Sequence, residues 1–132
     1  MKRNVSKSLL FICLGLITTI VFTSASMLYS HPGPPGKPQA YEVLRDQCSI
    51  RYSAPKDDGG SSITGYIIEC CNMVTGEWFK VSGKYPITEC VYTVTGMVEG
   101  SKVRFRVRAV NAAGYGEPSK ESDIITIEDP FN

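Results

Sequence analysis

Ser101–Val110, which reads SKVRFRVRAV, decides the fold because basic and apolar residues alternate from Lys102 to Ala109. The apolar positions are Val103, Phe105, Val107 and Ala109. The intervening positions are Lys102, Arg104, Arg106 and Arg108. A period of two puts successive side chains on opposite faces of a β-strand, so this stretch predicts a strand with one buried and one exposed face.

Short runs of the same kind surround this strand, and turn-rich segments separate them. The expected strands are Ala40–Leu44, Gln47–Tyr52, Ile63–Cys71, Glu77–Val81, Glu89–Thr95, Ser101–Val110 and Ser122–Ile127. Seven short strands with no helical period are typical of an all-β, antiparallel, immunoglobulin-like sandwich of two sheets. The side chains expected to fill the space between the sheets include Ile50, Tyr52, Tyr66, Ile68, Tyr92, Val94, Phe105 and Val107.

The first 29 residues differ from the rest in composition. Three basic residues precede an uncharged apolar run, Leu9–Phe22, and small residues follow at Ser24–Ser26. This order predicts a secretory signal peptide. Extended to Tyr29, the run is long enough for a signal-anchor or transmembrane segment, with membrane contact only through residues 9–29. A third interpretation is a wrong gene start that joined this run to an internal piece of a cytosolic protein.

Residues 30–38 form a stretch rich in proline and glycine, which is incompatible with a helix or a central strand. We expect it to be a semi-rigid, extended linker. The domain is then expected to occupy residues 39–129, and residues 130–132 to begin a following linker.

Charge and composition argue against catalysis and against nucleic-acid binding. Three of the 14 Lys and Arg residues precede residue 9, whereas all 13 Asp and Glu residues follow residue 31, so the domain has no basic excess. The single histidine, His31, lies in the expected linker, which leaves no material for a triad or a zinc site. The acidic loop at Asp57–Gly60 lacks the spacing of a calcium-binding loop. We therefore expect no enzyme activity, no metal and no cofactor.

Four cysteines fall in the expected domain: Cys48, Cys70, Cys71 and Cys90. Four cysteines allow three pairings, and spacing alone does not choose among them. We expect small apolar side chains with free thiols, as in a reducing compartment, while a disulfide stays the alternative for an exported protein.

Several motifs, taken in order, resemble one family. They are PGPPGKP (32–38), APKDDGGSSITGYIIE (54–69), TGEWFKV (75–81), YTVTGMVEG (92–100) and FRVRAVNAAGYGEPS (105–119). From about Pro32 to Phe131 the chain resembles the fibronectin type III domains of titin, twitchin and projectin. The resemblance implies a non-catalytic module of a sarcomeric scaffold that acts through mechanical continuity and weak, repeated protein contacts. The partners it implies are thick-filament proteins such as myosin, or neighbouring modules.

The N-terminal run supports a different function, a secreted or membrane-anchored module of a cell-surface adhesion protein or receptor. The two interpretations also differ in location, because the motifs imply the cytoplasmic sarcomere and the leader implies the outside of the cytosol. A third interpretation, an accessory domain of a larger enzyme, follows from the kinases that the giant muscle proteins carry. Neither an HRD nor a DFG triplet is present in this chain.

Two positions depart from the pattern of that family. Tyr52 stands where the family usually has tryptophan, which keeps an aromatic anchor but adds a hydroxyl that needs a partner. Val103 stands where the family usually has a tyrosine that ties down the preceding turn. We expect the turn at Glu99–Gly100 to lose that hydrogen bond and the domain to lose about 1 kcal/mol of stability.

The exposed face of the Ser101–Val110 strand is a candidate protein-contact surface. Trp78, or alternatively Phe79, lies on a strand that this fold puts in the same sheet. Guanidinium groups stacked on the indole would form a cation–π ladder, and Trp and Arg are common at binding hot spots. The alternative is separately solvated arginines, some of them paired with Glu69 or Glu77. The three arginines concerned are Arg104, Arg106 and Arg108.

The loop Asn111–Ser119 is a second candidate contact, because loops held by a rigid sandwich often carry recognition. Its predicted contact residues are Asn111, Tyr115 and Glu117.

Overall fold

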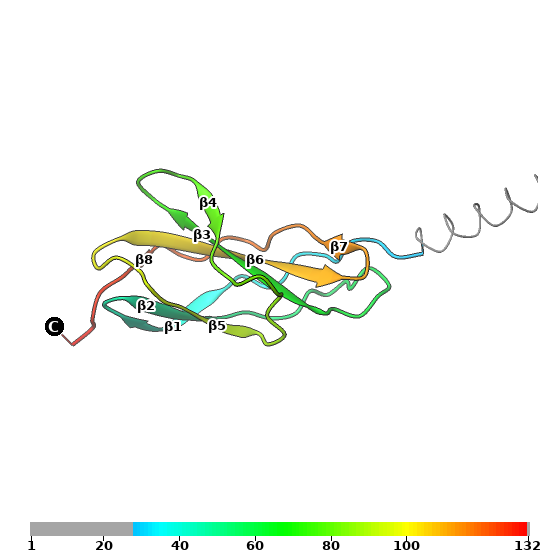
Figure 1. Cartoon of the computed structure of the whole chain (residues 1–132), viewed down its shortest axis with the longest axis horizontal. Coiled ribbons are helices and arrows are strands. Elements are labelled where there is room, and N and C mark those ends of the chain that lie inside the picture. The colour runs from blue at the N-terminus through cyan, green and yellow to red at the C-terminus, as the bar shows by residue number, and fades with distance from the viewer. Residues whose placement is uncertain (1–27, 132) are drawn as a thin grey trace, which may run out of the picture.

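Two antiparallel sheets make up the computed structural model of the chain, which describes residues 28–131 (Figure 1). The smaller sheet has the order β1-β2-β5, formed by Gln39–Leu44, Gln47–Arg51 and Val91–Val94. The larger sheet has the order β4-β3-β6-β7, with β8 also paired to β6. Its strands are β3 (Gly65–Asn72), β4 (Trp78–Lys80), β6 (Lys102–Asn111), β7 (Gly114–Tyr115) and β8 (Ile125–Thr126).

The core lies where the alternating pattern predicts it. Along β6, Phe105, Val107 and Ala109 are fully buried, and their sequence neighbours are only partly covered. Ile50 of β2 packs against them from the smaller sheet, and Ile68 of β3 lies beside them in the larger sheet. One predicted core residue, Tyr92, is only partly buried: it packs against the core, and its hydroxyl lies 3.4 Å from the Val81 carbonyl. The all-β sandwich is therefore confirmed.

The structure has eight strands where the sequence predicts seven, because the short strand β7 lies in the expected loop Asn111–Ser119, and only Ile125–Thr126 of the last expected strand pairs, as β8. β7 pairs with one end of β6 and β8 with the other end. Between them, the Ser119 and Ser122 hydroxyls accept hydrogen bonds from the backbone N–H groups of Val107 and Phe105, at 3.0 and 2.9 Å. These side chains take the role of backbone carbonyls, which satisfies β6 without a continuous partner strand.

Both departures from the family pattern find a local partner. The Tyr52 hydroxyl donates to the Glu89 carbonyl at 2.7 Å, which satisfies the buried polar atom that replaces the usual indole. At the turn before β6, the Ser101 hydroxyl donates to the Val98 carbonyl at 2.6 Å. Beside Val103 the structure leaves a cavity of about 180 Å³. Apolar residues of its lining are Phe79, Val81, Val94, Met97, Val98 and Val103.

Residues 30–38, expected as a linker, lie against the body of the domain. We call this segment, Ser30–Pro38, the strap. It runs beside Ser53–Gly59 and continues directly into β1 (Figure 1). The two ends of the described chain lie at opposite ends of the long axis.

The predicted signal peptide or anchor falls in residues 1–27, outside the described part of the chain, apart from its last residues. Within residues 28–131, no helix has the length and apolar character that a membrane crossing needs. Cys48, Cys70, Cys71 and Cys90 are unbonded thiols in that part of the chain. Burial raises the pKa of Cys70 to about 12, which keeps that thiol protonated and unreactive while the domain is folded.

Candidate protein-contact surface

The outer face of the larger sheet brings the predicted aromatic and arginine residues together. β3 lies between β4 and β6, so Glu69 pairs with Lys80 on one side and with Arg106 on the other. Two residues further along β3, Cys71 pairs with Trp78 on one side and with Arg104 on the other. Because residues two apart on a strand share a face, these side chains form one surface.

Arg106 makes both of the contacts that the sequence left as alternatives. Its guanidinium carbon lies 4.2 Å from the centroid of the Trp78 ring, within the range of a cation–π contact. Its Nε atom also donates to Glu69 Oε2 at 2.6 Å. The side chain of Arg106 is 21% exposed, so the stacked and paired guanidinium is partly shielded from water.

Arg108 extends this arrangement toward the β6–β7 turn. Its Nε atom donates to Glu69 Oε1 at 2.6 Å, and its Nη1 atom donates to the Gly116 carbonyl at 3.1 Å. The Tyr115 ring centroid lies 5.6 Å from its guanidinium carbon. Burial alone would raise the pKa of Glu69, but the hydrogen bonds from Arg106 and Arg108 outweigh burial and lower it. Glu69 therefore holds two arginines, each beside an aromatic ring.

Arg104 does not join this ladder. Its Nη1 atom pairs with Glu121 at 2.9 Å, and its Nε atom is buried without a hydrogen-bond partner. The ladder therefore has two rungs, Arg106 on Trp78 and Arg108 on Tyr115, and the third predicted arginine turns toward the 116–124 segment. Phe79, the alternative to Trp78, lies beside the cavity at Val103.

Asn111 is not an exposed contact residue, which corrects the prediction from the sequence. It is 4% exposed, and its Nδ2 atom donates to the carbonyls of Ser30 and Asp58, at 2.8 and 2.7 Å. Its Oδ1 atom accepts from the N–H of Ala113 at 2.9 Å. The amide is thus fully used inside the domain and holds the strap to the β6–β7 turn.

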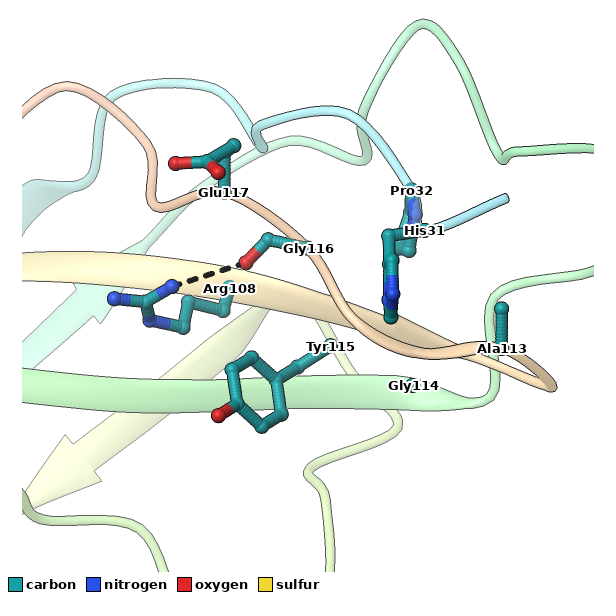
Figure 2. Close-up of a pocket in the computed structure, with 8 residues that line it drawn as sticks. All are labelled: His31, Pro32, Arg108, Ala113, Gly114, Tyr115, Gly116 and Glu117. Carbon is teal, nitrogen blue, oxygen red and sulfur yellow. Dashed lines mark hydrogen bonds between the residues drawn. The ribbon is translucent and has the colours of Figure 1, made fainter.

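The other two predicted loop residues, Tyr115 and Glu117, are exposed and line a groove of about 590 Å³ (Figure 2). His31 and Pro32 of the strap form the opposite wall, which the sequence analysis did not predict. The missed signal is the spacing Pro32, Pro35, Pro38, a three-residue period that suits a polyproline II helix with one buried side. Figure 2 also shows Arg108 donating to the Gly116 carbonyl beneath the groove.

The chemistry of this surface suits contact with another molecule better than a reaction. Arginine, tryptophan and tyrosine side chains supply hydrogen-bond donors and flat apolar area. Among residues 28–131, no three His, Cys, Asp or Glu side chains gather as metal binding would need.

The fold and this surface define a β-sandwich module of the fibronectin type III class. The sequence model of the family "Fibronectin type III domain" matches residues 33–125, and the chain belongs to this family. It is 36% identical to human (Homo sapiens) myomesin-2 over 101 residues, which are 76% of this chain and 7% of that protein. It is 35% identical to human (Homo sapiens) slow-type myosin-binding protein C over 101 residues, 74% of this chain and 9% of that protein.

A solved structure supports the same relationship. Titin module A71 from human cardiac muscle superposes with a TM-score of 0.68 and 38% identity, covering 75% of this chain and 95% of that module. The chain thus spans about one module, and less than a tenth of the length of these two muscle relatives. The resemblance to titin-type modules is confirmed.

Proposed function

We propose that this chain acts as a non-catalytic, load-bearing module of a sarcomeric scaffold and docks other proteins weakly through the outer face of its larger sheet. The carrying observation is the two-rung ladder, in which Glu69 fixes Arg106 against Trp78 and Arg108 against Tyr115. Side chains held in one geometry lose little entropy when a partner binds, which favours a contact surface.

The load-bearing part of the proposal rests on the path of the chain. The described chain enters at one end of the long axis and leaves at the other (Figure 1). Tension applied to the two ends therefore runs lengthwise along the strands, so several hydrogen bonds would have to break together. A chain of such modules would transmit force while each module stayed folded.

The docking part is tested with myosin, since one muscle relative is named for binding it. The chain is immobilised at high density, because weak sites gain through effective concentration. Trp78→Ala and Arg106→Ala should each weaken retention of purified myosin by about tenfold or more, as expected of hot-spot residues. Arg51→Ala, on the exposed end of β2 in the other sheet, is the control and should have no effect. Equal retention by the Arg106 and Arg51 variants would exclude the ladder as the docking site.

An extracellular module is the second candidate, and one observation favours it: the basic residues and the apolar run Leu9–Phe22 at the N-terminus. The full chain with a C-terminal tag, expressed in cultured cells, distinguishes the two. A tag that external protease removes from intact cells supports the surface module. A tag that is protected, with no tagged protein in the medium, supports the sarcomeric one.

A further inference from the structure

The strap is bound to the domain by a regular pattern of backbone hydrogen bonds. The N–H groups of Ser30, Gly33 and Gly36 donate to backbone carbonyls of the 53–59 segment at 2.9, 2.8 and 3.0 Å. Every third residue is therefore bonded, which is the period of a polyproline II helix. Buried prolines follow the same period, at positions 32, 35 and 38. One side of the strap thus faces the domain along its whole length.

Two glycines permit this close approach. A Cβ atom on Gly59 would lie 2.1 Å from the Ser30 carbonyl oxygen, and one on Gly116 would lie 1.9 Å from the Pro32 carbonyl oxygen. Both distances are far below van der Waals contact, so any other residue would push the strap away. The site for the strap is therefore built into two separate loops of the domain.

The same residues connect the strap to the contact surface. Gly116 touches Pro32 on one side, and its carbonyl accepts from Arg108 on the other. Asn111 joins Ser30 to Asp58 and also shapes the β6–β7 turn through Ala113. The strap therefore supports the Arg108–Tyr115 rung (Figure 2). The Arg106–Trp78 rung is instead supported by β3 and β4.

The strap is also the weaker unit. Its backbone makes three N–H bonds to the domain, and the other bonds are the Asn111 amide, a 3.4 Å contact of the Ser30 hydroxyl and the exposed Lys37–Asp123 ion pair. By contrast, β3 and β6 pair at eight positions. Regions with few bonds open locally at lower free energy than the core. Tension from the N-terminal side reaches the strap first, because the strap is where the chain enters the domain.

We propose that the strap is a releasable support that regulates one half of the contact surface. When bound, it holds the β6–β7 turn and the Arg108–Tyr115 rung in the form seen here. When tension or a competing segment lifts it, that rung loses its support, while the stacking of Arg106 on Trp78 keeps its own support from β3 and β4. That release of the strap regulates docking rests on the proposed function, whereas that the strap can be released does not.

Amide hydrogen exchange and NMR on the full chain test the release. In the unaltered protein, the amides of Ser30, Gly33 and Gly36 should share one protection factor. That factor should be at least about tenfold below the factors of Ile68 and Val107, a difference of about 1.4 kcal/mol. Equal protection of strap and core would overturn the proposal, since the strap would then open only with the whole domain. Strap amides without protection would overturn it as well.

Asn111→Ala tests the coupling between strap and surface. The signals of Ser30, Gly116 and the Arg108 Nε–H should shift, while that of the Trp78 indole should stay. Thr64→Ala is the control, because Thr64 bonds to the neighbouring Val110 carbonyl without touching the strap. Shifts at Ser30 without shifts at Gly116 and Arg108 would overturn the coupling. Myosin retention by the Arg106 variant reads the docking function separately, so failure of one proposal leaves the other standing.

Discussion

The two ends of the sandwich are built differently. At the N-terminal end, the strap, Asn111 and two glycines bring backbone into close contact, and the polar groups of Asn111 are bonded. At the C-terminal end, a valine stands where the family has tyrosine, a cavity remains, and Val98 and Phe131 are 73% and 91% exposed. The difference shows that one end is closed by specific contacts and the other is left open. The same kind of substitution should therefore change the stability of the domain by different amounts at the two ends.

The largest effect is expected from Gly59→Ala, with Gly96→Ala at the other end as its matched control. The two glycines have nearly the same backbone angle, φ of 74° and 70°, so an added Cβ costs both about 1 kcal/mol. Gly96 has open space around it, whereas Gly59 meets the Ser30 carbonyl. Gly59→Ala should therefore lower the free energy of unfolding by about 3 kcal/mol, because strap bonds are lost in addition. Equal losses in urea denaturation would remove the distinction between the ends.

Asn111→Ala should come next, with a loss of about 2 kcal/mol. It removes a buried amide that makes three hydrogen bonds, and it leaves the Ser30 and Asp58 carbonyls without that donor. Thr64→Ala, which removes an exposed bond to Val110, should cost well under half as much. Thermal unfolding of both variants measures the difference, and a similar shift in Tm for the two would argue against a special role for Asn111.

Val103→Tyr should stabilise the open end by about 1 kcal/mol. The new ring extends toward the cavity beside Val103, and burial of part of its area supplies the gain. The substitution should raise the urea midpoint without changing the slope of the transition. A lower midpoint would mean that the cavity does not admit the ring.

The smallest effect on stability is expected at Glu69, which lies between the two ends of the sandwich. Its pKa in the folded state lies below the ordinary value, so its stabilising contribution is complete above the unfolded pKa and is lost as pH falls through the folded pKa. Glu69→Gln should cost under about 1 kcal/mol at pH 7 and less in acid. Glu42→Gln, on the exposed β1 strand, is the control and should show no such pH dependence. A constant cost for Glu69→Gln across pH would contradict the ion-pair interpretation.

The sandwich and half of the ladder could be predicted from the sequence because both follow from a period of two. Phe105 inside and Arg106 outside are fixed by their positions on one strand, and the place of the Trp78 strand in the same sheet follows from the fold. The strap could not be predicted in the same way. Its burial depends on the carbonyls of Gly59, Asp57 and Ser53, which are distant in the sequence, and a proline-rich stretch is equally typical of a linker.

Asn111 illustrates the same limit for a single side chain. A polar residue in a glycine-rich loop is usually solvated, and the burial of Asn111 is favourable because the Ser30 and Asp58 carbonyls and the Ala113 N–H satisfy its amide. The shortening of the last strand to Ile125–Thr126 was missed for a related reason. Sequence patterns count strands by backbone pairing, whereas Ser119 and Ser122 satisfy β6 with their hydroxyls.

The segment that carries these serines also affects how copies of the domain behave when they lie close together. A strand at the margin of a sheet normally offers a row of unpaired N–H and C=O groups, on which another molecule can add a strand. Here the chain beside β6 is irregular from Gly116 to Ile124 and contains Pro118, Lys120 and Glu121. An incoming strand finds neither a straight template nor a neutral surface, so copies held at high local density resist edge-to-edge aggregation.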